Sequence, residues 1–320
     1  MNASRVSKPD VHEIPIKHPW GNRCLLLLLA MMLPNSIVDA QTPDARRAFG
    51  YLEKTCRIGK RISGTAGMDK QRQMLIQHFE ALGAQVKLQP LRVTHPLNGT
   101  PVRLVNMIVS WHPTSRERVL LACHYDTRPY PDRDRFRSRG EFLGANDGAS
   151  GVALLMELGH HMRELKPRYG IDFVFFDAEE FVFSSRDKYF LGSEHFARVY
   201  RDQPPMHRYR FGVLVDMIGD KRLTVYQEKN SLKYAPSLTQ SLWDSAKRAG
   251  VKEFIAKAKH EVQDDHIPLN TIAAIPTCDL IDFDYRYWHT TKDLPRNCSG
   301  TSLAKVGRVL LRWFNEMPAN

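Results

Sequence analysis

The sequence predicts a single-domain α/β protein, with a twisted, mostly parallel mixed β-sheet that carries helices on both faces. Short apolar runs alternate with amphipathic helical patterns from residue 43 onward, which is the order that strand–helix repeats give to a parallel sheet. The chain has 320 residues, of which 42% are hydrophobic, and can bury one full core. Because no internal repeat or composition break follows residue 43, we expect one domain over residues 41–320.

Each element is predicted from its apolar spacing. Apolar residues three and four positions apart indicate helices, and Gly83 ends the second of them. Helices are predicted at 43–60, 70–82, from the turn at 144–151 to about 165, near 194–200, and at 238–249 and 302–315. Alternating or continuous apolar runs predict strands at 85–93, 104–111, 118–123, 171–176, 212–215, 223–227 (an edge strand) and 274–281.

Residues 1–40 are typical of a secretory signal peptide. The ten apolar residues 24–33 precede Pro34 and a small-residue cleavage site that ends at Ala40. Ten residues are too few to cross a bilayer, which needs ~20. We expect cleavage after Ala40 and a secreted, periplasmic or other extracytoplasmic protein; anchoring in the membrane by an uncleaved signal is the less favoured alternative.

The net charge of +11 makes acidic molecules plausible partners. The densest basic stretch is 128–139, where arginines alternate with aspartates. No nucleic-acid-binding motif accompanies these arginines, and the interleaved acids weaken the field that phosphates would feel. We therefore expect a solvated loop and no nucleic-acid partner.

Four cysteines lie beyond the signal segment. Cys123 and Cys278 fall within apolar strand patterns, where cysteines usually behave as small buried hydrophobic side chains. Cys56 and Cys298 lie in more polar stretches, so they are the favoured disulfide pair in an oxidising compartment.

Acidic and histidine side chains follow the ends of several predicted strands. His124, Glu179, Glu180 and Asp216 each closely follow an apolar strand, and His289 comes a short loop after another. Ligands of open α/β sheets bind beyond the carboxyl ends of the strands. These five side chains are therefore expected to converge on one crevice.

The adjacent Glu179 and Glu180 indicate metal chemistry. Two acids at the end of a buried strand repel each other and are costly to desolvate without a cation. One carboxylate can hold the metal while its neighbour, kept off the metal, moves a proton.

The other candidate ligands also admit structural interpretations. His124 with Asp126 two residues on fits a metal ligand with its orienting partner, but a hydrogen-bonded pair without metal is the commoner arrangement. Asp147, at a helix start, fits an N-cap as well as a ligand. With Asp216 and His289 as further ligands, the set offers oxygen and nitrogen donors without thiolates, which is compatible with an open catalytic zinc site.

Five segments resemble the co-catalytic zinc aminopeptidases and their relatives, the animal-type glutaminyl cyclases. They are His124-Tyr125-Asp126, residues 144–151, residues 177–180, Asp216-Met217-Ile218-Gly219 and Trp288-His289-Thr290. The resemblance spans roughly residues 45–315, and it implies zinc and a mixed, twisted sheet with helices on both faces.

The cyclase resemblance implies a catalytic domain with one zinc, which is held by Asp147, Glu180 and His289. Glu179 would then be the catalytic proton shuttle.

In this branch Asp216 and Asp264 would be hydrogen-bonded behind Glu179 and would raise its pKa by like-charge repulsion. The aminopeptidase resemblance instead implies a second zinc held by His124 and Asp216, and a Glu179 that activates a metal-bound water.

Three features favour the cyclase. Residues 263–269 resemble the segment that frames the cyclase substrate pocket, where Gln263 would offer its backbone to the substrate. Trp288 resembles a wall of that pocket, and residues 216–219 also match the cyclase better.

Two features favour the peptidase. The turn at 144–151 is closer to the peptidase form, and the loop after Glu180 has no tryptophan where animal cyclases place one. Phe181 or Phe183 could replace that tryptophan as an apolar wall.

The sequence thus predicts a zinc-dependent glutaminyl-peptide cyclotransferase, which converts the N-terminal glutamine of peptides or proteins to pyroglutamate with release of ammonia. The alternative is a two-zinc exo-aminopeptidase. A non-catalytic module on the same fold is disfavoured, because every ligand position is kept. The basic loop at 128–139 is a candidate rim of the pocket, where it would favour acidic peptides.

Overall fold

The computed structural model describes residues 42–317. The signal peptide predicted at residues 1–40 lies outside this range. Among the described residues, no helix has both the length and the apolar character needed to cross a membrane.

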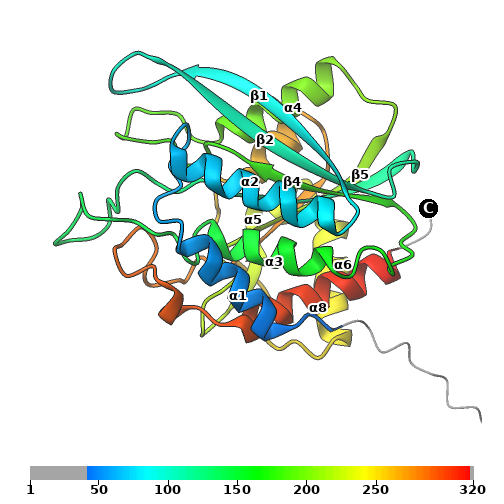
Figure 1. Ribbon diagram of the computed structural model, residues 1–320. Coiled ribbons are helices and arrows are strands. Elements are labelled where there is room, and N and C mark those ends of the chain that lie inside the picture. Colours follow the sequence, from blue (N-terminus) through cyan, green and yellow to red (C-terminus); the bar gives the residue numbers. More distant parts are fainter. Residues whose placement is uncertain (1–41, 318–320) are drawn as a thin grey trace, which may run out of the picture. The chain divides into compact units, whose positions relative to one another are not determined.

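A six-stranded mixed sheet forms the centre of the fold, with the strand order β1-β2-β4-β3-β5-β8 (Figure 1). The strands are β1 Gln85–Thr94, β2 Pro101–Trp111, β3 Glu117–His124, β4 Gly170–Phe176, β5 Arg208–Asp216 and β8 Thr277–Ile281. Strands β4, β3, β5 and β8 are parallel, whereas β1 and β2 are antiparallel to each other and β2 is antiparallel to β4. The predicted mostly parallel mixed sheet is confirmed.

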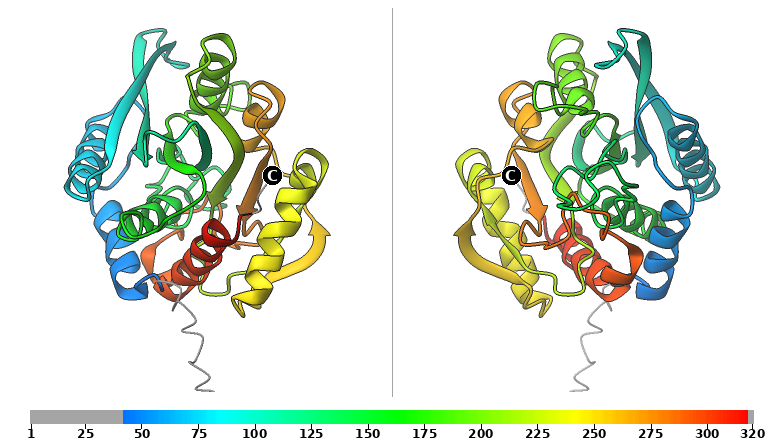
Figure 2. Two further views of the ribbon diagram at one scale, coloured as in Figure 1. Left: turned by 90° about the vertical axis from the view of Figure 1, so that its right-hand side faces the viewer. Right: turned by 90° about the vertical axis from the view of Figure 1, so that its left-hand side faces the viewer.

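Helices cover both faces of this sheet (Figure 2). The helices α1 Ala45–Cys56, α2 Ala66–Ala81, α3 Ala149–Gly159, α6 Pro236–Arg248 and α8 Gly300–Glu316 contribute to the larger core cluster. The other face is covered by α4 Leu191–Asp202 and α7 His266–Thr271, which pack in a smaller cluster. The remaining elements are β6 Val225–Glu228, α5 Lys229–Tyr234, β7 Phe254–Lys259 and the 3₁₀ turn Pro295–Asn297.

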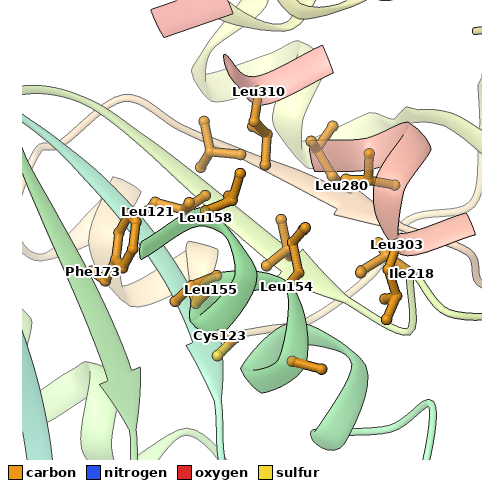
Figure 3. Packing of buried hydrophobic residues seen from close by; sticks show 14 of the residues in the cluster. Leu121, Cys123, Leu154, Leu155, Leu158, Phe173, Ile218, Leu280, Leu303 and Leu310 are labelled. Carbon is orange, nitrogen blue, oxygen red and sulfur yellow. The ribbon is translucent and has the colours of Figure 1, made fainter. Parts of the chain in front are cut away.

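The apolar runs of the central strands are explained by burial on both faces. On β3, Leu121 and Cys123 face the larger cluster, while Leu120 and Ala122 face the smaller one. Figure 3 shows the larger cluster, with the α3 leucines packed between the sheet and α8. A strand between two helical layers needs apolar residues at every position, which is why these strands do not alternate with polar residues.

Short elements account for most differences from the predicted boundaries. β7, half exposed and rich in lysine, and α5 were not predicted, because neither has a strong apolar period. β6 is not an edge of the main sheet but pairs with β7 in a separate two-stranded parallel sheet. Helix α3 ends at Gly159, several residues before the predicted end.

The cysteines differ from expectation. All four described cysteines are buried and are free thiols. Burial raises the pKa of the Cys56 thiol to about 11, and it raises the pKa of Cys298 well above its usual value. The prediction that Cys56 and Cys298 lie in polar surroundings is therefore wrong. The disulfide predicted between them is absent among the described residues.

A buried ion pair fixes the three central strands at the end where β3 begins. The Arg118 guanidinium on β3 donates to both carboxylate oxygens of Asp172 on β4, at 2.8 and 2.7 Å. The same carboxylate accepts a hydrogen bond of 2.6 Å from the Tyr209 hydroxyl on β5. Arg118 and Asp172 are 2% and 1% exposed, so the contact fixes strand register inside the protein.

We predict that Arg118→Ala lowers the free energy of unfolding by about 3–5 kcal/mol, because it leaves the buried Asp172 carboxylate unpaired. Urea denaturation monitored by circular dichroism measures the change. The matched control is Arg116→Ala, an exposed arginine two residues away, which should change stability by less than about 0.5 kcal/mol. Equal losses in the two variants would contradict this role.

Candidate active site

The predicted polar side chains converge beyond the carboxyl ends of the parallel strands. His124 ends β3, Glu179 and Glu180 follow β4, and Asp216 ends β5. These strands are neighbours in the sheet, so their ends lie together. A cavity of about 410 Å³ opens there, and its lining includes the site residues Asp147, Glu179, Glu180, Asp216, Gln263, Asp264, Trp288 and His289.

Asp147 lies at the centre of the cluster. Its Oδ1 atom is 3.3 Å from His124 Nε2, and its Oδ2 atom is 3.6 Å from His289 Nε2. His289 Nε2 also lies 2.8 Å from Glu180 Oε1, and His124 Nε2 lies 3.3 Å from Asp216 Oδ1. The two oxygens of one carboxylate thus face two separate groups of nitrogen and oxygen donors.

This donor set fits zinc. Tetrahedral zinc with bonds of ~2.0–2.1 Å separates neighbouring donor atoms by roughly 3.3 Å, and the donors named above are 2.8–3.6 Å apart. Donor atoms of His124, Asp147 and Glu180 all lie within 4.8 Å of one another. Among residues 42–317, the buried Asp147 Oδ2 atom has no hydrogen-bond partner, so this oxygen is available to a metal ion.

The electrostatics of the cluster also favour a cation. Burial and then repulsion by Glu180 raise the pKa of Asp147 to about 6. Burial opposes ionisation of Glu180, but His289 and Arg128 together lower its pKa to about 2. Although burial also opposes the charge on His289, Glu180 and Asp132 raise its pKa to about 9. The carboxylates therefore require positive charge, which protonated imidazoles or a bound divalent metal can supply.

The Asp126 side chain supports the glutamate pair by binding the backbone amides of both glutamates. Its carboxylate accepts hydrogen bonds of 3.1 Å from the amides of Glu179 and Glu180, and it lies 3.6 Å from His124 Nδ1. The turn before these glutamates contains Ala178 at φ 58°, a left-handed conformation that is unfavourable for alanine. Asp126 thus stabilises a strained turn, whereas its carboxylate lies near the His124 ring at a distance too long for a hydrogen bond.

Three further residues support ligand candidates and were missed by the sequence analysis as site residues. Arg128 donates to both carboxylate oxygens of Glu180, from its amide at 3.1 Å and its side chain at 3.2 Å. Asp132 Oδ1 lies 3.1 Å from His289 Nδ1, where it can fix the orientation of the ring. The sequence feature that could have indicated Arg128 and Asp132 is their four-residue spacing in the basic loop. Arg128 Nε and Asp132 Oδ1 lie 2.9 Å apart.

The third such residue is Asp293, which holds the turn before α3. Its carboxylate accepts from the amides of Asn146 and Asp147 at 2.8 and 3.1 Å. The N-cap of α3 is Gly148, at φ 88°, and no side chain in the described part of the protein caps this helix. The capping interpretation of Asp147 is therefore wrong. A Cβ at Gly148 would lie 2.8 Å from the Asp126 carbonyl oxygen, so the position requires glycine.

Glu179 lies apart from the donor set. Its side chain is 12% exposed, and its Oε2 atom is 3.9 Å from His124 Nδ1. Burial first, then repulsion by Glu180 and by Asp264, raise the pKa of Glu179 well above its usual value. Asp264 lines the same cavity, and its own pKa is raised by burial and by Asp216. The expected hydrogen bonds from Glu179 to Asp216 and Asp264 are not present among the described residues.

Apolar side chains form the walls of the cavity. Trp288 packs against Phe283, with ring centroids 4.7 Å apart, and against His289 at 4.3 Å. The other apolar and aromatic lining residues are Tyr189, Phe190, Met217, Val262 and Ile281. The suggestion that Phe181 or Phe183 replaces a wall tryptophan is wrong, because those rings pack against each other and against His95.

Comparison with known proteins places this geometry in a family. The family model described as Peptidase family M28 matches residues 106–314. The chain belongs to this family. Its curated relatives include the glutaminyl-peptide cyclotransferase of Bos taurus, which is 26% identical over 291 residues that cover 78% of this chain and 76% of the relative.

Solved structures of two kinds resemble the chain. The glutaminyl cyclase of Fimbriiglobus ruber superposes with a TM-score of 0.82 at 41% identity, covering 85% of this chain and 95% of that one. A leucine aminopeptidase precursor from Bacteroides thetaiotaomicron superposes with a TM-score of 0.81 at 31% identity, covering 88% and 99%. The fold alone therefore does not separate the two activities, whereas sequence identity is higher with the cyclase.

We predict that zinc stabilises the protein. Zinc at a thousandfold excess over its Kd should add about 4 kcal/mol to the free energy of unfolding, since the unfolded chain lacks the site. Thermal unfolding of chelator-treated protein, with and without added zinc, measures the effect. Asp147→Asn should abolish the zinc-dependent rise in Tm, while Asp202→Asn, a change on an exposed carboxylate of α4, should preserve it. An unchanged Tm for wild-type protein would argue against a metal site.

Proposed function

We propose that the protein is a zinc-dependent glutaminyl-peptide cyclotransferase. It closes the N-terminal glutamine of peptides or proteins into pyroglutamate and releases ammonia. The observation that carries the proposal is the cavity wall, where Gln263 and Trp288 lie together with Glu179 beside the metal-binding donor set. The 41% identity with the Fimbriiglobus ruber glutaminyl cyclase supports it.

Asp147, Glu180 and His289 would hold the zinc. When bound, the metal supplies Lewis-acid polarisation of the γ-carboxamide of the substrate glutamine. Arg128, Asp132 and Asp293 keep these ligands in place through the contacts described above. Second contacts of this kind fix the orientation of ligands and raise metal affinity.

Glu179 moves the proton. The α-nitrogen of the glutamine bonds to the δ-carbon of its own side chain, and the bond from that carbon to the amide nitrogen breaks. Glu179 accepts the proton that the α-amine loses and delivers it to the departing ammonia, so no water is consumed. A pKa raised by burial and by Glu180 suits a carboxyl that must act as both base and acid.

Gln263 and Trp288 position the substrate. The Trp288 ring packs along the aliphatic part of the glutamine side chain, and Gln263 offers its backbone. The apolar walls restrict water near the reacting carbon, which favours ring closure over hydrolysis. The substrates are peptides outside the cytoplasm, in keeping with the signal peptide expected at residues 1–40.

One observation favours a second candidate, a two-zinc exo-aminopeptidase. Asp147 faces His124 through one oxygen and His289 through the other, and Asp216 lies 3.3 Å from His124. In this interpretation Asp147 would contribute to both metal sites, and His124 and Asp216 would hold the second ion. In that reaction Glu179 activates a water, and the first residue of the peptide is released.

The decisive experiment is incubation of purified, zinc-loaded protein with an amidated peptide that begins with glutamine. We expect a product whose mass is lower by one ammonia. Mass spectrometry at matched times against an enzyme-free control separates catalysis from spontaneous cyclisation. Release of free glutamine with a shortened peptide would overturn the cyclase proposal in favour of the peptidase.

Glu179→Gln should lower kcat by roughly 10²–10⁴-fold, the usual contribution of a general acid–base group. The amide keeps the size of the side chain but carries no exchangeable carboxyl proton. Metal analysis should show wild-type zinc content, because Glu179 is outside the ligand set. Glu80→Gln, on the exposed side of α2, is the control. Wild-type turnover in the Glu179 variant would refute the assigned role.

A further inference from the structure

A second hollow adjoins the cavity. Its lining includes Arg133, His260, Phe283, Asp284, Arg286 and Trp288. Three of these residues, Arg133, Phe283 and Trp288, also line the cavity, so they form a rim shared by the two depressions. None of the residues that we assign to zinc lines the hollow.

Arg133 is held at this rim by its neighbours. Its guanidinium lies 3.9 Å from the centre of the Trp288 ring, within the range of a cation–π contact. Its amide donates a 3.1 Å hydrogen bond to the carbonyl oxygen of His289. The next residue, Asp134, accepts from the amide and the hydroxyl of Thr291 at 3.0 and 2.5 Å. These contacts attach the basic loop to residues 288–291, which include Trp288.

The hollow has uncompensated positive charge. Arg133 and Arg286 are exposed, and neither forms an ion pair within the described range 42–317. The acid of the hollow, Asp284, is already paired with Lys259 at 2.5 Å and with His260 at 2.9 Å.

Two other acids are nearby, but they line the cavity rather than the hollow. Asp132 is paired with Arg128 and lies against His289. Glu261 lines the cavity on the segment that carries Gln263. Within residues 42–317, neither carboxylate forms an ion pair with Arg133 or Arg286.

We propose that this hollow is a subsite for an acidic side chain that follows the N-terminal glutamine of the substrate. The inference rests on the proposed cyclase activity. With the glutamine in the cavity, the peptide leaves over the shared rim and passes Arg133 and Arg286. A guanidinium binds carboxylate through paired, charge-assisted hydrogen bonds, so glutamate or aspartate at the second or third position is favoured there.

The test compares amidated peptides that differ only in glutamate, glutamine or lysine at position two, and a second series varied at position three. We expect kcat/KM for the glutamate peptide in one series to exceed that of its glutamine isostere by about twofold to fivefold, the contribution of one exposed ion pair. The excess should shrink in ~1 M salt, where the Debye length falls to about 3 Å.

Arg133→Ala and Arg286→Ala should each reduce the glutamate-to-glutamine ratio toward unity, and Arg133→Lys should retain part of it. Arg135→Ala is the matched control: it removes the same charge from the same loop but lines neither depression, so the ratio should stay at its wild-type value.

The outcomes separate the two proposals. A wild-type ratio near unity in both series, with efficient cyclisation of the neutral peptides, overturns the subsite and leaves the cyclase intact. Equal loss of the ratio in the Arg133 and Arg135 variants also overturns it, since the net charge of the loop would then be the cause. Failure to cyclise any peptide overturns the proposed activity and the subsite with it.

Discussion

Repulsion among buried carboxylates is the constraint around which the site is organised. Asp147, Glu180 and Asp216 lie together with little access to water, and such a group is stable only beside positive charge. His124 and His289 supply nitrogen donors that face these carboxylates. Glu179 is less well compensated, at 3.9 Å from His124 Nδ1, and burial followed by repulsion from Glu180 raises its pKa. The proposed metal binding and the proposed proton transfer therefore share one electrostatic origin.

The site also depends on backbone conformations that the rest of the fold must stabilise. Ala178, Met217 and His289 have φ values of 58°, 49° and 55°, and left-handed conformations of such residues cost about 1–3 kcal/mol each. Hydrogen bonds from the glutamate amides to Asp126 offset part of this cost. The parallel strands, buried on both faces, provide the rigid base from which these turns extend.

Most of the fold could be predicted, because buried strands and amphipathic helices have strong apolar periods. The convergence of His124, Glu180 and Asp216 could be predicted too, since parallel strands end at one edge of a sheet. The contributions of Arg128 and Asp132 could not, because their four-residue spacing does not show which charges of the loop contact Glu180 and His289. The failed wall assignment has a similar origin: Phe181 is as apolar as Phe190, and only tertiary packing decides which ring faces the cavity.

The attachment of the basic loop has a consequence for how this enzyme can diversify. In its first part, Arg128 contacts Glu180, Asp132 contacts His289 and Asp134 contacts Thr291, so changes there would perturb the candidate metal ligands. Residues 135–139 are exposed and lie beyond the last of these contacts. Insertions and charge reversals in this short stretch should therefore be tolerated with little effect on the cavity, whereas a change of peptide preference requires substitution of Arg133 or Arg286, which line the adjoining hollow.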